Sequence, residues 1–237
     1  MMAGQKSSAT SELRNGAHLA RAELPERALR HQLSEGLERL GMVLDENQQD
    51  HLIEYLALLV RWNAVYNLTA VRDPFDMLAL HVLDSLSIVD LIRECKGLEV
   101  LDVGTGAGLP GIPLAIALPR HTVHMVDAVA KKISFLQQVK SLLELPNIGA
   151  AHVRIEALTL AKMPDIIVSR AYADLTRMVR SIAHLTDAST TVIAMKGVEP
   201  NAELAELPVS WKLVELRPLD VPFIGAHRCA VVLRRAR

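Results

Sequence analysis

The stretch "VLDVGTGAGLPGIPLAI" at residues 100–116 constrains the fold more than any other part of this sequence. An apolar run ends in Asp102, and glycines then stand at positions 104, 106, 108 and 111. Glycine lets the backbone turn sharply and lets another group approach it closely. A strand that leads through a glycine loop into an apolar helix is typical of α/β folds, whose ligands bind at the carboxyl ends of the strands.

The segments that follow support an α/β fold. Short β-branched runs alternate with helical segments, and we predict strands at 99–103, 122–126, 151–155, 166–169 and 190–195. This alternation predicts a doubly wound parallel sheet with helices on both faces. The strand-like segments 211–219 and 228–236 have no helix between them, so they predict an antiparallel hairpin at one edge.

The part before residue 97 has a different pattern. Apolar residues recur at three- and four-residue spacing through residues 28–93, which predicts amphipathic helices. Asp45 is the expected N-cap of one helix, and Asp73-Pro74 marks the start of another. We therefore predict a mobile tail at 1–25, a helical N-terminal extension at 26–96 and an α/β domain at 97–237.

Composition excludes several classes of protein. The net charge of −1 gives no general basicity, so any RNA binding must come from local basic groups. The two cysteines, Cys95 and Cys229, are too few for a disulfide framework and are expected to be buried thiols. No apolar run reaches the ~18 residues of a membrane span, and the polar N-terminal segment lacks the apolar core of a signal peptide. We predict a cytoplasmic protein without membrane contact and without a metal site.

The glycine loop poses the question of its ligand. Residues 106–111 match G-x-G-x-x-G, the dinucleotide fingerprint, but Asp102 would repel a pyrophosphate at that position. S-adenosylmethionine has no phosphate and carries an ammonium and a sulfonium, which carboxylates attract. Asp127, after the second strand, is placed to accept hydrogen bonds from both ribose hydroxyls. We predict S-adenosylmethionine as the cofactor; NAD or FAD binding, or a structural turn in which Asp102 caps a helix, are the alternatives.

The segment after the fourth strand limits the methyl acceptor. Enzymes that methylate exocyclic base amines resemble one another in an Asn/Asp-Pro-Pro-aromatic motif at this place. This sequence has Ser169-Arg170-Ala171 there instead. A nucleophilic cysteine for cytosine C5 is absent there, and no Lys-Asp-Lys-Glu tetrad for ribose can be assembled. Guanine N7 carries no proton, so its methylation needs positioning and no general base.

Five segments together resemble the family of bacterial small-subunit (16S) rRNA guanine-N7 methyltransferases, historically called glucose-inhibited division protein B. They are "WNAVYNLTAVRD" (62–73), "HVLDSL" (81–86), "LDVGTGAGLPGIPLAI" (101–116), "SRAYA" (169–173) and "MKG" (195–197). The resemblance implies a class I S-adenosylmethionine-dependent methyltransferase with a Rossmann-like sheet. It also implies methylation of N7 of a single guanine, position 527 of 16S rRNA, in the small ribosomal subunit.

The resemblance and the loop argument together predict the cofactor site. By resemblance, cofactor contacts fall on Gly104, Leu109 and Arg170, and Ile155 and Glu156 frame the adenine. The loop argument adds Asp102, Gly106 and Asp127. No catalytic residue is assigned, because the expected mechanism is positioning, and Arg170 and Lys196 are the candidates for a catalytic role.

The expected RNA contacts are basic residues at the rim of the site, namely Arg72, Lys131, Lys132 and Lys196. Solvation is the alternative for Lys131, Lys132 and Lys196, and a structural ion pair is the alternative for Arg170. Asn63 and Asn67, with Trp62 and Tyr66 beside them, line either the target-base pocket or the packing surface of the extension. His81 and Asp84 are expected to make structural hydrogen bonds, since two residues alone make a poor metal site.

The predicted partner is 16S rRNA, presented within the small ribosomal subunit to a monomeric enzyme. Two other functions remain open from the sequence. One is methylation of a protein or a small molecule on the same fold, because a fold does not fix the acceptor. The other is a non-catalytic module that assists ribosome assembly.

Overall fold

A computed structural model describes residues 24–236 of the 237-residue chain. Apart from Leu24 and Pro25, the tail predicted at 1–25 lies outside the described residues. Within the described range, no helix is both long and apolar enough to cross a lipid bilayer.

The centre of the molecule is a seven-stranded sheet in the order β3-β2-β1-β4-β5-β7-β6. Its strands are β1 (Glu99–Val103), β2 (Thr122–Asp127), β3 (Ile148–His152), β4 (Ile166–Arg170), β5 (Thr191–Lys196), β6 (Trp211–Pro218) and β7 (Cys229–Arg235). The first five strands pair in parallel, whereas β7 pairs antiparallel with both β5 and β6. The predicted doubly wound sheet with an edge hairpin is therefore confirmed.

The third strand differs from its predicted position at 151–155. It begins at Ile148, which pairs with Val123, and ends at His152, which pairs with Asp127. The prediction was wrong because it followed β-propensity, whereas pairing with β2 recruits the weakly β-forming Gly149 and Ala150. Ile155 consequently lies beyond the strand, in a short 3-10 turn, η2 (Ile155–Ala157).

The N-terminal extension consists of short and long helices. They are α2 (Glu26–Arg39), α3 (Glu46–Tyr66), α4 (Pro74–Met77), a π-helical turn η1 (Leu78–Leu83), α5 (Asp84–Leu86) and α6 (Val89–Glu94). Asp45 caps α3 through a capping box with Gln48, as the sequence predicts. The Asp73 carboxylate accepts hydrogen bonds from the backbone of Phe75 and Asp76, which starts α4 at Pro74.

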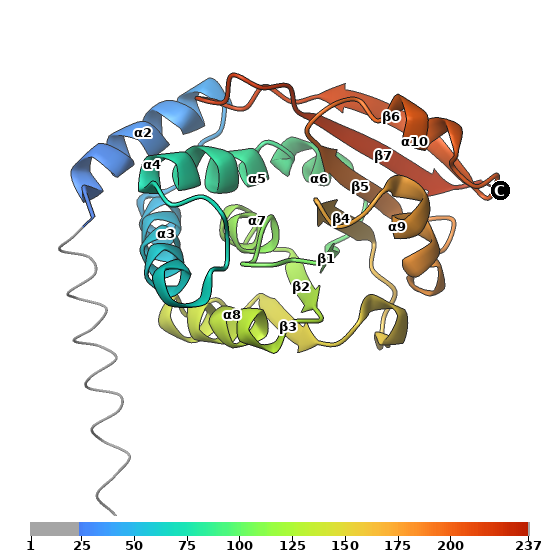
Figure 1. Ribbon diagram of the computed structural model, residues 1–237, viewed down its shortest axis with the longest axis horizontal. Helices are drawn as coiled ribbons and strands as arrows, with labels where there is room; N and C mark the ends of the chain where they lie inside the picture. Colours follow the sequence, from blue (N-terminus) through green and yellow to red (C-terminus); the bar gives the residue numbers. More distant parts are fainter. Residues whose placement is uncertain (1–23, 237) are drawn as a thin grey trace, which may run out of the picture.

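Two hydrophobic cores cover the two faces of the sheet, because successive strand residues point to opposite sides. Val100 belongs to the core shared with the extension, α7 (Gly111–Ala117) and α8 (Ala130–Leu142), whereas Leu101 belongs to the core under α9 (Leu175–Ser181). Figure 1 shows this layering, with the blue and teal helices of the extension on the same side as α7 and α8. Two small elements, η3 (Ala183–Leu185) and α10 (Asn201–Ala205), complete the described chain.

The extension is joined to the α/β part by buried polar contacts as well as by apolar packing. The Tyr55 hydroxyl donates to the Ala107 carbonyl at 2.8 Å, and the Trp62 indole donates to the Gln138 side chain at 2.5 Å. Trp62 also contacts Phe135, with their ring centroids 5.4 Å apart. The packing interpretation of Trp62 is thus confirmed.

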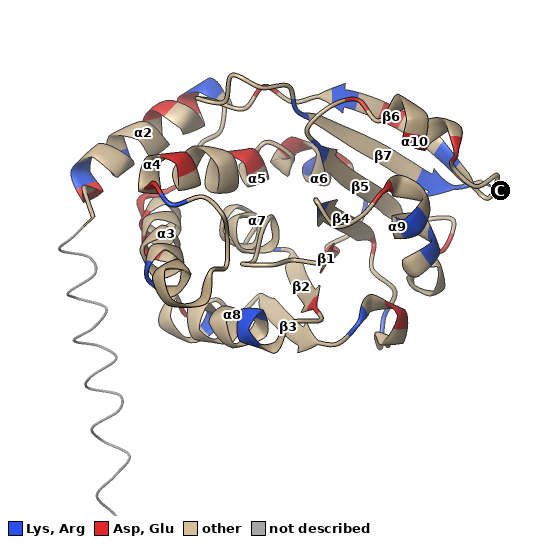
Figure 2. Cartoon of the chain, in the orientation of Figure 1, with Lys and Arg blue, Asp and Glu red and all other residues tan. Residues whose placement is uncertain are grey.

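Acidic and basic residues are interspersed along the chain (Figure 2), in keeping with its near-zero net charge.

Candidate active site

The glycine loop begins directly after β1 and is anchored to the neighbouring strand. The backbone N–H groups of Gly104 and Thr105 both donate to the carbonyl of Val126, at 2.9 and 3.1 Å. Gly104 has φ +68°, and a Cβ there would lie 2.5 Å from the Tyr172 ring. Gly106 also has a positive φ, of +62°, but a Cβ there would reach only the Gly104 carbonyl, at 4.0 Å. Packing therefore requires glycine at 104, whereas Gly106 leaves the loop open to a ligand.

Asp102 lies beneath this loop and is fully buried. Its Oδ2 accepts hydrogen bonds from the Thr105 hydroxyl at 2.6 Å and from the Gly111 N–H at 2.8 Å, at the start of α7. Oδ1 has no hydrogen-bond partner among the described residues. Burial raises the pKa of Asp102 to about 6, although both hydrogen bonds oppose that shift. One oxygen thus shapes the loop, as the capping alternative proposed, and the other remains unsatisfied.

Asp127 connects the end of β2 to the same loop. Its Oδ2 accepts from the Gly106 N–H at 3.0 Å and from the Lys132 ammonium at 3.1 Å, and its Oδ1 accepts from the Val129 N–H at 2.9 Å. A carboxylate oxygen has two lone pairs, so Oδ1 retains the capacity to accept a hydroxyl. The carboxylate is therefore held in a fixed orientation at the position where the sequence predicts ribose binding.

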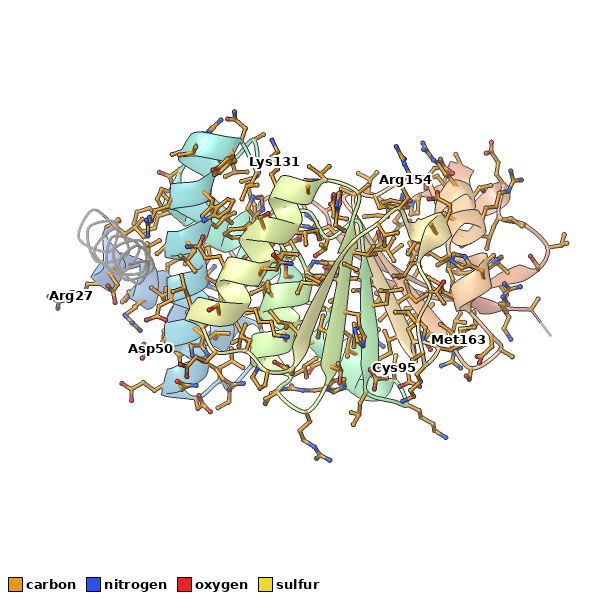
Figure 3. The ribbon with its side chains drawn as sticks, turned by 90° about the horizontal axis from the view of Figure 1, so that it is seen from below. Arg27, Asp50, Cys95, Lys131, Arg154 and Met163 are labelled. Carbon is orange, nitrogen blue, oxygen red and sulfur yellow. The ribbon has the colours of Figure 1, made fainter. Side chains whose placement is uncertain are left out.

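The remaining predicted cofactor residues come from two neighbouring segments. Leu109 is buried in the glycine loop, and Ile155 is buried in η2 after β3, while the adjoining Glu156 is exposed. Figure 3 shows Arg154 and Lys131 at one edge of the molecule and Cys95 at the opposite edge. Arg154 immediately precedes η2 and Lys131 lies in the first turn of α8. The segments after β2 and β3 therefore meet at the carboxyl edge of the sheet.

This arrangement fits S-adenosylmethionine. The loop is open at Gly106, where a side chain would otherwise project, and the oriented Asp127 carboxylate lies next to it. The ionised Asp102 carboxylate, whose Oδ1 has no hydrogen-bond partner among the described residues, places negative charge beneath the loop, which suits a cation and disfavours a pyrophosphate.

A cavity of about 520 Å³ opens beside the glycine loop, at the carboxyl ends of β1, β4 and β5. The loop contributes Gly104 to Ala107 and Leu109, and the strand ends contribute Arg170, Ala171 and 195–197. The extension closes the other side with Leu68, Thr69, Leu80, His81 and Asp84, and the last strands add Leu219, Arg228 and Cys229. The cavity thus lies between the predicted cofactor loop and the extension, and predicted cofactor residues form one of its walls.

Among the described residues, four charged side chains line this cavity, namely Asp84, Arg170, Lys196 and Arg228, and Asp84 binds both arginines. Asp84 Oδ2 accepts from Nη1 of Arg170 at 3.0 Å, and its Oδ1 accepts from Nε of Arg228 at 3.3 Å. The same Nη1 of Arg170 donates to the Leu80 carbonyl in the π-helical turn, at 2.8 Å. Arg170 is therefore fixed to the extension by an internal ion pair while it lines the cavity.

His81 is another extension residue in the cavity wall. Its Nε2 lies 2.8 Å from the Thr69 hydroxyl, and its Nδ1 is buried without a partner among the described residues. Burial and the nearby Arg170 charge lower the pKa of His81 to about 4, so the ring is neutral at physiological pH. Together with the Asp84 ion pairs, this contact confirms the predicted structural hydrogen bonding of His81 and Asp84.

The four predicted RNA contacts all have internal partners. Arg72 donates to the Asn63 carbonyl and to the Asn67 side chain, and Lys131 donates to the Tyr66 carbonyl. Lys132 pairs with Asp127, as described above. Lys196 pairs with Glu203 at 2.7 Å and lines the cavity. Arg72 and Lys131 are exposed, so their charges remain accessible to a polyanion. Their role in RNA binding stays a prediction.

Both asparagines on the last turn of α3 have structural tasks. Asn63 is buried and bonds to the backbone of Thr69 and Val71, so it orders the loop between α3 and α4. Asn67 ends the helix in the left-handed conformation, with φ 49°.

Of the two cysteines, Cys229 is buried as predicted, whereas Cys95 is half-buried, and burial raises the pKa of both thiols.

Three polar residues of the site were not singled out as site residues from the sequence. Thr69 and Arg228 line the cavity, and Tyr55 supports the glycine loop from below. Arg228 directly precedes an apolar strand, and Tyr55 occupies an apolar helical position, so neither pattern distinguishes them from ordinary surface and core residues. Thr69 lies within the segment "WNAVYNLTAVRD", which is the one signal that pointed to it.

The fold and the site define a class I S-adenosylmethionine-dependent methyltransferase. Among solved structures, the crystal structure of a SAM-dependent methyltransferase from Aquifex aeolicus superposes with a TM-score of 0.52 at 16% identity, over 69% of this chain and 94% of that one. The sequence matches the family described as rRNA small subunit methyltransferase G over residues 48–232. The chain belongs to this family, which confirms the resemblance.

Curated relatives agree with the family assignment. "Ribosomal RNA small subunit methyltransferase G" of Herminiimonas arsenicoxydans is 47% identical over 207 residues, which cover 86% of this chain and 94% of the relative. The protein of the same name from Stutzerimonas stutzeri is 44% identical over 204 residues, which again cover 86% of this chain and 94% of the relative.

Proposed function

We propose that this protein transfers the methyl group of S-adenosylmethionine to N7 of guanine 527 in 16S rRNA of the small ribosomal subunit. Family membership supports an rRNA substrate. The observation that carries the choice of acceptor is the cavity beside the glycine loop, whose described wall carries three basic side chains, Arg170, Lys196 and Arg228, and one carboxylate, Asp84. The N–H donors of these basic side chains match the oxygens of a guanine nucleotide.

Methyl transfer to guanine N7 requires that the base be positioned correctly, and it requires no proton transfer. When bound, S-adenosylmethionine supplies an electrophilic methyl group. Guanine N7 has an in-plane lone pair and no proton, so the chain has to hold the base in line and keep water away. The apolar walls at Leu80, Leu109 and Met195 exclude water, and both oxygens of the Asp84 carboxylate are already bound to arginines. The cavity of about 520 Å³ lies within the usual range for small-ligand sites, and a base turned out of its stack would share it with the methyl-donating end of the cofactor, since predicted cofactor residues also line it.

The two parts of the chain then have separate tasks. Residues 97–237 hold the cofactor through Asp102, Gly104, Gly106, Leu109, Asp127, Ile155, Glu156 and Arg170. Residues 26–96 form an RNA-facing extension, to which Arg72 belongs, and Lys131, Lys132 and Lys196 lie at its border. Because the net charge of the chain is −1, its affinity for RNA has to come from local contacts and from the fit of its surface to the RNA. We also infer that the enzyme is a cytoplasmic monomer and that its rRNA substrate is presented within the small subunit.

The direct test incubates the protein with methyl-labelled cofactor and small subunits from cells that lack this enzyme. Label in 16S rRNA, recovered as 7-methylguanosine, is the expected result. Label in a ribosomal protein or in a small molecule would replace the RNA acceptor with another one. Cofactor binding without any transfer would leave a non-catalytic assembly role.

A further inference from the structure

We propose that Asp84 is a positioning residue that holds Arg170 and Arg228 together at the acceptor cavity, so that their remaining N–H groups face the oxygens of the target nucleotide. The inference rests on the proposed function, since it assigns a task in the same acceptor cavity. It concerns a carboxylate that touches neither the glycine loop nor the predicted cofactor residues other than Arg170.

The geometry around Asp84 supports such a role. The residue is only 3% exposed, and each carboxylate oxygen pairs with a different arginine, at 3.0 Å for Arg170 and 3.3 Å for Arg228. Arg170 uses Nη1 for both Asp84 and Leu80, so its Nε and Nη2 groups have no partner among the described residues. The carboxylate therefore fixes one side of the guanidinium and leaves the other free.

Three distant segments meet at this carboxylate. Asp84 opens α5, Arg170 ends β4, and Arg228 directly precedes β7. The π-helical turn before Asp84 contributes as well, because the Asp84 N–H bonds to the Ala79 carbonyl five residues earlier. This wider turn presents the Leu80 carbonyl and the Asp84 carboxylate to one guanidinium nitrogen. π-helical turns within helices are frequent at functional sites.

Stability alone gives little reason for this arrangement. A buried carboxylate between two arginines loses solvation that its ion pairs barely recover, and apolar replacements are often more stable. What the trio does supply is orientation, together with one positive charge in excess at the cavity wall. Guanidinium groups in a fixed orientation recognise carbonyl and phosphate oxygens through paired hydrogen bonds. Guanine presents O6 next to N7, whereas adenine presents an amine there, so oriented donors favour guanine.

The test variant is Asp84→Asn, with Asp90→Asn as its matched control. Asp90 lies nearby in α6, is mostly exposed and pairs only with Arg93 among the described residues. For Asp84→Asn we expect kcat/KM for unmodified small subunits to fall about tenfold or more, because the arginines lose their alignment. Cofactor affinity should fall far less than kcat/KM, because Arg170 is the only predicted cofactor residue that Asp84 contacts in the described part of the chain. Affinity for unrelated single-stranded RNA should hold or rise, because the chain loses one negative charge. Asp90→Asn should match the wild type.

A double-mutant cycle separates positioning from a general structural effect. Arg228→Gln leaves the Asp84–Arg170 pair intact and should lower kcat/KM by more than its fall in thermal stability explains, since Asp84 Oδ1 loses a buried partner. If Asp84 acts through Arg228, the double variant should be much less impaired than the two single effects combined. Three results would each overturn the role of Asp84. One is a fully additive loss of kcat/KM in the double variant, and another is a wild-type kcat/KM in Asp84→Asn. The third is a loss of kcat/KM that is fully explained by the fall in melting temperature. An inactive wild-type protein would instead overturn the proposed function on which the role depends.

Discussion

The hydrogen bond between Tyr55 and the glycine loop gives a sharp prediction about how the extension supports cofactor binding. Tyr55 is fully buried in α3, and its hydroxyl donates to the Ala107 carbonyl at 2.8 Å. Tyr55→Phe removes the donor without a large change in shape and leaves a buried carbonyl unsatisfied. Such a loss costs about 1–3 kcal/mol. Because the carbonyl belongs to the loop, we expect weaker cofactor binding in addition to lower stability.

The assay compares Tyr55→Phe with Tyr66→Phe, which changes an exposed tyrosine at the end of the same helix. Thermal unfolding should show a fall of about 2–4 °C per kcal/mol for a chain of this size in Tyr55→Phe, and almost none in Tyr66→Phe. Calorimetric titration should show a several-fold higher Kd for S-adenosylmethionine in Tyr55→Phe alone. A wild-type Kd and melting temperature in Tyr55→Phe would refute the idea that this contact holds the loop.

Three further changes test other parts of the site. Asp127→Ala should weaken cofactor binding by about 1.5–3 kcal/mol, through loss of charge-assisted hydrogen bonds; an unchanged calorimetric Kd would remove the ribose assignment. Lys196→Gln should lower the slope of log Kd against log salt for RNA by about 0.7–0.9 at unaltered cofactor affinity, and an identical slope would count against a phosphate contact. Burial lowers the pKa of His81 from 6.5 to about 4, so unfolding takes up a proton in that range and the free energy of unfolding should fall as the pH drops from 6.5 to 4. His81→Gln should remove on the order of 3 kcal/mol of that decrease, measured by denaturant titration at several pH values; Asp102 contributes with the opposite sign in both proteins, because its folded-state pKa is raised to about 6.

Most of the fold could be predicted because its signals are local. The apolar run before Asp102, the alternation of strand and helix, and the capping residues Asp45 and Asp73 each specify structure within a few residues. The β3 boundary could not be predicted, since it depends on pairing with β2 and not on the propensity of Gly149 and Ala150. Strand register is a tertiary property that a single segment does not encode.

The site was predictable only in part, for a related reason. The glycine loop and Asp127 are linked by spacing along the chain, so sequence reasoning found them. The acceptor cavity instead joins Asp84, Arg170 and Arg228, which are separated by 86 and 144 residues from the carboxylate that connects them. No periodicity relates such positions. The π-helical turn that directs Asp84 is also invisible to a pattern search based on a regular helix.

The most direct test of the central claim maps 7-methylguanosine in 16S rRNA from cells with and without this protein, by reduction, strand cleavage at the modified base and primer extension. If this protein methylates guanine 527, one cleavage stop at that guanine vanishes when the protein is deleted and returns when the wild-type chain is restored. A stop that persists without the protein, or an rRNA unmodified at that guanine in both strains, would contradict it.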